Sequence, residues 1–138
     1  MSSTTRFGVS LDNRLLSKFD RLNKKKGYAN RSEAIRDLIR KELVTLEWSE
    51  DKDIAGTVTL VYDHHFRGLS NKLIEIQHNY TNLIIASQHI HIDHDNCLEI
   101  IILKGSPKKM GEICSHLKTT KGIKHCSLTM ATTGKDLD

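Results

Sequence analysis

Apolar residues recur at two different spacings along this chain, and the changes between them divide it into predicted elements. From Arg6 to Leu11 every second residue is apolar, which is the spacing of a strand. Between positions 12 and 46 apolar residues recur every three or four positions, which predicts two helices. From Ile54 onward, segments with strand and helix spacing follow in the order strand, helix, strand, strand, helix, strand.

The two helices predicted for the N-terminal part have recognisable ends. Asp12 can cap the first, and Lys24–Lys26 followed by Gly27 suits its end, where cations and glycine are favoured. Asn30 can cap the second, with Glu33 three residues later as in a capping box, and this helix should reach about position 46. A strand and two helices of this size bury too little surface to be stable alone.

The C-terminal part predicts an α+β domain. Strands are expected at 54–65, 82–92, 98–103 and 123–130, with helices at 69–80 and from Pro107 to Gly122. This order is that of the ferredoxin-like βαββαβ fold, an open antiparallel sheet with both helices on one face. The uncovered face of such a sheet usually packs against a second copy, as in ligand-sensing domains of the ACT type. We therefore expect one domain at 1–50 and a second at 51–138.

Charge and soft metal ligands are distributed unequally between these two parts. Residues 1–50 hold 11 Lys and Arg against 7 Asp and Glu, whereas residues 51–138 hold 10 against 10. All eight histidines and all three cysteines lie in the second part. The division suggests an anion-binding head followed by a ligand-sensing body.

The expected compartment follows from what the sequence lacks. No apolar run is long enough to span a membrane, so no membrane partner is expected, and no charged-then-apolar leader is evident. The cysteines are odd in number, so a disulfide framework is not expected. A reducing cytoplasm fits these observations.

A second copy of the chain would complete the N-terminal part. Two copies of the strand from Arg6 to Leu11 could pair antiparallel, which would bury the apolar face and satisfy both strand edges. The residues presented outward would be Arg6, Gly8 and Ser10. A two-stranded ribbon fits the major groove of DNA, where Arg is the commonest reader of guanine.

The run from Arg6 to Asp12, the pair Gly27-Tyr28 and the run from Asn30 to Arg40 resemble a ribbon-helix-helix DNA-binding domain. The resemblance covers positions 6–46 and implies an intertwined dimer that binds double-stranded operator DNA. Free N–H groups and a cationic side chain at the start of the second helix would hold a phosphate. The residues concerned are Asn30, Arg31 and Ser32. Gly8 departs from the hydroxyl residue of many members, so it would make no side-chain contact with a base.

Four residues of the C-terminal part predict a transition-metal site. His89 and His91 flank Ile90 in a strand-like run, so both imidazoles leave the same face. Cys97 follows a turn-like segment, so a hairpin would bring its sulfur beside them. His78, near the end of the preceding helix, completes the set. Imidazole and thiolate exclude Mg²⁺ and Ca²⁺ and suit Ni, Cu, Co or Zn.

The length of the hairpin loop decides whether the cysteine joins the histidines. An odd loop, such as Asp93 to Asp95, places Cys97 opposite His91 and Glu99 opposite His89 on one face, whereas an even loop places Cys97 on the other face. We expect the odd loop. Glu99 and Tyr62 are then candidates to orient the histidine ligands, because ligating histidines usually donate their other N–H to a nearby acceptor.

The spacings of 11, 2 and 6 positions between His78, His89, His91 and Cys97 resemble the nickel motif of the NikR family of nickel-responsive transcription regulators. Members join a ribbon-helix-helix domain to an ACT-type domain in this order, so the resemblance covers essentially the whole chain. It implies a homotetramer with one Ni²⁺ per subunit, held by three histidines and one cysteine. The first histidine, here His78, would come from a neighbouring subunit.

The resemblance also implies a second cation, for example K⁺, that links the two domains. Glu33 and Asp37 would help to hold it, since they lie four positions apart on one face of the second helix. The remaining histidines could give weaker surface sites; they are His64, His65, His94, His116 and His125.

These features predict a nickel-dependent transcriptional repressor rather than an enzyme. It would bind palindromic operator DNA and, by the resemblance, control nickel-uptake genes. The alternative is a ribbon-helix-helix regulator that senses an amino acid or another metal through its ACT-type domain; amino-acid binding would leave the four-residue spacing unexplained. A Cys–His hydrolase using Cys97 and His91 would lack an evident third partner and oxyanion loop.

Overall fold

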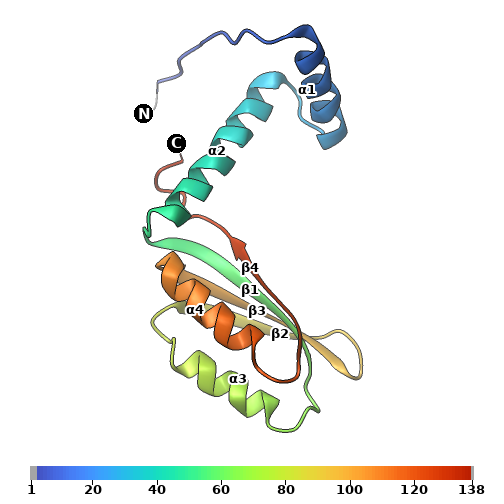
Figure 1. The fold of residues 1–138 in the computed structure, drawn as a ribbon, viewed down its shortest axis with the longest axis vertical. Coiled ribbons are helices and arrows are strands. Elements are labelled where there is room, and N and C mark those ends of the chain that lie inside the picture. The colour runs from blue at the N-terminus through green and yellow to red at the C-terminus, as the bar shows by residue number, and fades with distance from the viewer. Residues whose placement is uncertain (1–2, 138) are drawn as a thin grey trace. The chain divides into compact units, whose positions relative to one another are not determined.

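The computed structural model describes residues 3–137 of the 138-residue chain. The chain forms two compact units: one extends to Leu43 and includes the segment from Gly134, and the other is Val44–Thr133. Figure 1 shows the helices and strands of both units. Among the described residues, no helix combines the length and apolar character needed to cross a membrane.

The first unit contains the two predicted helices. Helix α1 (Asn13–Lys26) begins where Asp12 Oδ1 accepts a hydrogen bond from the backbone N–H of Arg14 at 2.8 Å, and it ends at Gly27, whose φ of 81° is left-handed. Helix α2 (Arg31–Ser49) begins where Asn30 Oδ1 accepts from the N–H of Glu33 at 2.9 Å. Both caps are as predicted, and α2 is three residues longer than the expected end at position 46.

The segment from Arg6 to Leu11 is not a strand in the single chain. Its apolar face is open, with Phe7 72%, Val9 58% and Leu11 42% exposed. A strand requires a second backbone for its hydrogen bonds, and within one chain this segment pairs with none. The alternating apolar residues of this segment therefore form a surface that remains uncovered in a single chain.

The second unit is a four-stranded antiparallel sheet with two helices. Its elements are β1 (Ile54–Asp63), α3 (Leu69–His78), β2 (Ile84–His91), β3 (Asn96–Gly105), α4 (Pro107–Lys118) and β4 (Ile123–Met130). The strand order is β2-β3-β1-β4, and α3 and α4 lie on one side of the sheet (Figure 1). The chain thus has the predicted α+β architecture, with two N-terminal helices followed by a ferredoxin-like βαββαβ domain.

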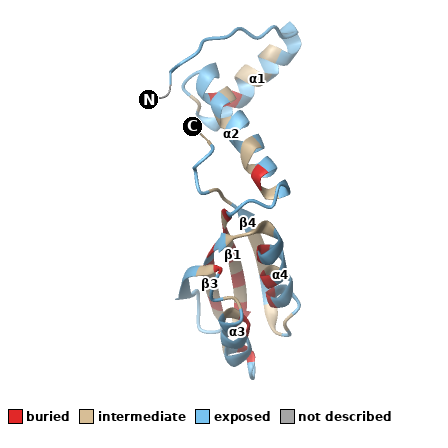
Figure 2. Cartoon of the chain, turned by 90° about the vertical axis from the view of Figure 1, so that its left-hand side faces the viewer, coloured by how far each residue is buried: buried red, intermediate tan, exposed pale blue. Residues whose placement is uncertain are grey.

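The core lies between the sheet and these two helices. Burial alternates along β1 and β3, and the buried positions of α4 follow helical spacing at Met110, Ile113 and Leu117 (Figure 2). The end of α2 also belongs to this unit, because Trp48 Nε1 donates to the carbonyl of Ala131 at 2.9 Å. Helix α2 therefore continues past its predicted end because its last turn packs on the sheet domain.

The hairpin between β2 and β3 has the odd loop that was predicted. The backbone N–H of Ile92 donates to the carbonyl of Asn96 at 2.9 Å, which leaves three loop residues, Asp93 to Asp95. Asp93 Oδ1 accepts from the backbone N–H groups of Asp95 and Asn96 at 2.9 and 2.8 Å. The aspartate side chain closes the turn and fixes the register of the two strands.

Candidate metal centre

Three strands place side chains of the candidate centre in two rows on the helix-covered face of the sheet. In one row Tyr62 on β1 pairs with Cys97 on β3, and Cys97 pairs with His91 on β2. In the next row Glu99 pairs with His89. Residues that stand opposite each other in a sheet share a face. The hairpin therefore has the predicted register, with both histidines on the face of the cysteine.

The sulfur of Cys97 is the centre of the cluster. Cys97 is fully buried, and its Sγ lies 3.4 Å from Nδ1 of His91 and 3.1 Å from Nδ1 of His64. One donor atom of each of these three residues lies within 4.8 Å of the others. His64 follows β1, whereas His91 and Cys97 face each other across the hairpin. The structure thus brings two of the four predicted ligands together and adds a histidine.

The contact of His64 was missed by the sequence prediction, which named it only as one of five weaker candidates. A signal for it was present: His64 lies two positions after Tyr62, so the alternation of β1 extends to it. Tyr62 pairs with Cys97, and a residue two positions further along would lie on the same face. The prediction extended the strand to position 65 but assigned His64 only to a weaker surface site.

His89 is held in a separate hydrogen-bonded chain. Its Nδ1 lies 3.4 Å from the hydroxyl of Tyr62, which also donates to Glu99 Oε2 at 3.2 Å. Gln77 Nε2 on α3 donates to the other oxygen, Glu99 Oε1, at 3.2 Å. Tyr62 and Glu99 are both buried, so these hydrogen bonds hold the His89 ring in one orientation.

The protonation of these groups follows from their burial. Burial raises the pKa of the Cys97 thiol above its usual value, although a backbone hydrogen bond from His64 opposes the change. Burial lowers the pKa of His64, and the neighbouring His65 and His91 lower it further. Burial, followed by the charge of Glu99, raises the pKa of Tyr62, which therefore stays a hydrogen-bond donor.

His78 is not part of this cluster within one chain. It is the last residue of α3 and is exposed. Among the described residues, the two sets of three or more donors close enough for a metal are His64, His91 and Cys97, and Asp63, His64 and His65. The contribution of His78 from a neighbouring subunit remains a prediction.

The residues present fit nickel by their donor chemistry. The cluster offers imidazole nitrogens and one thiol sulfur at a buried position, with one imidazole, that of His91, exposed at its edge. Imidazole and thiolate suit first-row metals such as Ni, Cu, Co and Zn, whereas Mg²⁺ and Ca²⁺ require oxygen ligands. The donor set is therefore that of a soft-metal site.

The predicted DNA-binding residues lie in the first unit. Arg6, Gly8 and Ser10 are exposed in the segment before α1. Asn30 caps α2, and Arg31 forms a two-pronged ion pair, from Nε to Asp20 Oδ1 at 2.9 Å and from Nη2 to Asp20 Oδ2 at 2.8 Å. Ser32 is exposed in the first turn of α2. A phosphate at this helix start would therefore meet an Arg31 that already has an anionic partner.

The two carboxylates predicted to hold a second cation have different surroundings. Asp37 accepts a short hydrogen bond from the hydroxyl of Tyr28 and lies 3.1 Å from Nζ of Lys41. The Tyr28 hydrogen bond, followed by that of Lys41, lowers the pKa of Asp37. The backbone N–H of Glu33 donates to Asn30. In the described part of the chain, neither carboxylate belongs to a cluster of three or more His, Cys, Asp or Glu donors close enough to hold a metal ion.

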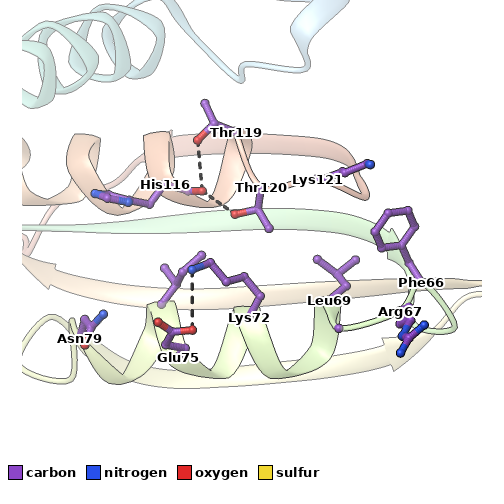
Figure 3. A pocket seen from close by; sticks show the side chains of 12 residues that line it. Phe66, Arg67, Leu69, Lys72, Glu75, Asn79, His116, Thr119, Thr120 and Lys121 are labelled. Carbon is purple, nitrogen blue, oxygen red and sulfur yellow. Dashed lines mark hydrogen bonds and ion pairs between the residues drawn. The ribbon is translucent and has the colours of Figure 1, made fainter.

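A separate cavity of about 640 Å³ lies between α3 and α4 (Figure 3). Part of its polar lining is paired within the chain: Nζ of Lys72 lies 3.7 Å from Glu75, and the hydroxyl of Thr120 donates to the carbonyl of His116 at 2.7 Å. None of the four predicted nickel ligands lines it, although His116, a candidate for a weaker site, does. The metal centre is therefore distinct from this cavity.

Comparisons with known proteins agree with this arrangement. Residues 55–131 match the family model described as the NikR C terminal nickel binding domain, and residues 5–46 match that of the ribbon-helix-helix protein, copG family. The chain is 54% identical over 135 residues to a protein of Syntrophus aciditrophicus, with 98% of each chain covered. It is 53% identical over 137 residues to one of Desulfovibrio desulfuricans, with 99% of each covered. Both relatives bear the name "Putative nickel-responsive regulator".

A solved structure has a fold similar to that of part of this chain. The uncharacterized protein TM1266 of Thermotoga maritima matches 59% of this chain and all of its own, with a TM-score of 0.54 and 13% identity. At this identity the likeness concerns the fold alone.

A ribbon-helix-helix segment followed by a ferredoxin-like domain that carries imidazole and thiol donors defines a metal-responsive DNA-binding regulator rather than an enzyme. The family model and the relatives that match along the full chain name nickel as the metal. The chain belongs to the family of nickel-responsive regulators.

Proposed function

We propose that this protein is a nickel-dependent transcriptional repressor that binds palindromic operator DNA and controls nickel-uptake genes in the cytoplasm. The observation that supports it best is the pairing of His91 with Cys97 across the β2–β3 hairpin. This register places an exposed imidazole at a buried sulfur, in a chain whose N-terminal part matches a DNA-binding family. The same chain thus carries a soft-metal site and a DNA-binding part.

The proposed ligands of one Ni²⁺ per subunit are His89, His91 and Cys97 of one chain and His78 of a neighbouring chain. Nickel bound by this set would join two subunits. The exposure of His78 at the end of α3 supports its use by another chain, because its imidazole is free of the cluster in its own chain. The side chains of one hairpin supply the other three positions.

Tyr62 and Glu99 are proposed to orient the ligands. The Tyr62 hydroxyl donates to Glu99 and lies 3.4 Å from His89 Nδ1, and Gln77 holds the far oxygen of the same carboxylate. Because Tyr62, Glu99 and Gln77 are connected by hydrogen bonds, the orientation of the His89 ring depends on all three. Removal of such an outer partner typically lowers metal affinity about 10–100-fold.

DNA binding is proposed for both the ribbon and the start of α2. Two copies of the segment from Arg6 to Leu11 would pair, cover its exposed apolar side chains and present the opposite face to the major groove. The proposed contacts are Arg6, Gly8, Ser10, Asn30, Arg31 and Ser32. Phosphate at Arg31 would have to compete with Asp20 or share the guanidinium with it.

The proposed assembly is a homotetramer of two ribbon-helix-helix dimers around a core of four ACT-type domains, with domains at 1–50 and 51–138. Each dimer would bind one half-site of the operator. Glu33 and Asp37 are proposed to help hold a second cation such as K⁺. Because the two sites are coupled, operator DNA should tighten nickel binding by the same factor as nickel tightens DNA binding.

The competing function is a regulator that senses an amino acid or another metal through the same domain. Calorimetric titration of the full-length protein with Ni²⁺, Cu²⁺, Co²⁺, Zn²⁺ and a set of amino acids distinguishes these cases. Metal-dependent footprinting on genomic DNA then identifies the operator. Protection that requires Ni²⁺ supports the proposal, and protection by an amino acid without metal would reject it.

The ligand assignment is tested by Cys97→Ser. The nickel complex of the wild-type protein should show an absorbance band of a nickel–thiolate bond, and the variant should lack it. Cys114→Ser is the matched control, because it removes a thiol of the same domain that has no contact with the cluster. An unchanged spectrum in the Cys97 variant would reject this cysteine as a ligand.

A further inference from the structure

Two cysteines outside the metal centre lie side by side. Cys114 on α4 and Cys126 on β4 have their Sγ atoms 3.7 Å apart, and Cys126 Sγ lies 3.8 Å from the carbonyl oxygen of Cys114. Both are partly buried free thiols. The metal centre uses neither of them, and 12 positions separate them in the sequence.

The packing of α4 on the sheet brings these sulfurs together. Cys114 lies beside the buried stripe of α4, next to Ile113. Cys126 pairs with Leu60 on β1, a fully buried residue, so its side chain lies on the helix-covered face. The contact between the sulfurs thus follows from the same packing that forms the core, rather than from an exposed loop.

We propose that Cys114 and Cys126 form a thiol–disulfide site that is oxidised by low-molecular-weight disulfides. One cysteine thiolate attacks such a disulfide, forms a mixed disulfide and releases one small thiol. The second cysteine then attacks the sulfur of the first, which forms the Cys114–Cys126 bond and releases the other small thiol. Two cysteine thiols are oxidised and one small disulfide is reduced to two thiols, so electrons and protons balance.

Burial, followed by the neighbouring Cys114, raises the pKa of the Cys126 thiol. The thiolate is the attacking species, so single variants of the two cysteines determine which of the two sulfurs attacks first. In the resolving step the sulfurs must approach from 3.7 Å to about 2 Å, the length of a disulfide bond.

Cys97 has no equivalent route. Its sulfur contacts the Nδ1 atoms of His64 and His91, whereas the other two cysteines contact each other. A mixed disulfide at Cys97 would therefore have no neighbouring thiol to resolve it within the described chain. The Cys114–Cys126 pair can be oxidised while the thiol of the metal centre stays free.

The test incubates the full-length protein with oxidised glutathione, blocks remaining thiols by alkylation and maps the peptides by mass spectrometry. We expect the number of free thiols to fall from three to one, with Cys97 alkylated and the two other peptides joined with loss of two hydrogens. Dithiothreitol should restore all three thiols. Three thiols that stay free, separate glutathione adducts on both cysteines, or a bond to Cys97 or between subunits would overturn the proposal.

Single variants test the order of attack. In Cys126→Ser the glutathione adduct on Cys114 should persist, because the resolving thiol is missing. In Cys97→Ser the Cys114–Cys126 bond should form as in the wild type. In Cys114→Ser the corresponding adduct on Cys126 should persist, and the faster of the two modification rates identifies the cysteine that attacks first. The peptide map of the wild-type protein decides the existence of the bond even if a variant fails to fold.

Discussion

The Nδ1 atom of His64 lies 3.1 Å from the Sγ atom of Cys97, closer than the 3.4 Å of His91 Nδ1. A residue that was expected only at the surface thus contacts the buried sulfur. The proposed ligand set contains Cys97 and His91 but not His64. His64 therefore either binds the metal together with Cys97 or only hydrogen-bonds the Cys97 thiol.

His64→Ala distinguishes these two cases. In the proposed ligand set the thiol is bound without His64, so we expect nickel affinity to stay within about tenfold of the wild type, below the usual loss for a residue that orients a ligand. The nickel–thiolate absorbance band should also remain. His65→Ala is the matched control, because its ring centroid lies 3.9 Å from that of His64 while its ring nitrogen Nδ1 contacts Asp63. Loss of the band in His64→Ala alone would make His64 a ligand.

A mixing experiment tests whether His78 serves a neighbouring subunit. The variants His78→Ala and Cys97→Ser should each fail to bind nickel tightly. Oligomers formed from both should recover binding, because an intact His78 from one chain can meet an intact hairpin of the other. Nickel titration and the thiolate band measure the recovery.

The control for this mixture pairs Cys97→Ser with His91→Ala. These residues lie opposite each other in one hairpin, so mixed oligomers contain no hairpin that has both. No recovery is expected there. If the His78→Ala and Cys97→Ser mixture bound no more nickel than its two components, His78 would not be shared between subunits.

Arg6→Ala should weaken operator binding at every nickel concentration without changing nickel affinity. A good guanine contact by arginine contributes about 1–3 kcal/mol of discrimination, so the loss should be at least about fivefold. Fluorescence anisotropy with operator DNA and a nickel titration measure the two effects. Arg67→Ala, an exposed arginine of the sheet domain, removes the same charge and should leave operator affinity nearly unchanged. If nickel affinity fell in Arg6→Ala, the DNA-reading strand would be placed wrongly.

The sequence predicted the hairpin well because two independent constraints agree there. Alternation fixed the face of His89 and His91, and the three-residue loop then decided the face of Cys97. Both constraints are local, so a single chain suffices to infer them. The Asp93 side chain closes this loop through contacts that the prediction did not name.

Contacts between distant segments were less predictable. His64 meets Cys97 across 33 positions, and Arg31 meets Asp20 across 11 positions between two helices. The Arg31–Asp20 spacing follows from no helix period, and the alternation of β1 gives the face of His64 but not its partner on another strand. The strand from Arg6 to Leu11 is a different case, because its pattern describes a pairing that one chain cannot make by itself.

Asp37 should make the stability of the N-terminal unit dependent on acidic pH. The hydrogen bond from Tyr28, followed by that from Lys41, lowers the pKa of Asp37 below its usual range. A carboxylate with a lowered pKa stabilises the fold above the pKa of the unfolded chain, and this contribution is lost as the pH falls through the folded value. Asp37→Asn should therefore lower the free energy of unfolding at neutral pH, and its difference from the wild type should shrink as the pH falls below the usual pKa of an aspartate, about 3.9. Urea unfolding at fixed protein concentration across this range measures the difference, with Glu42→Gln as the control for an exposed carboxylate of the same helix. A difference that stayed constant across the range would show that the ionised form of Asp37 does not stabilise the fold.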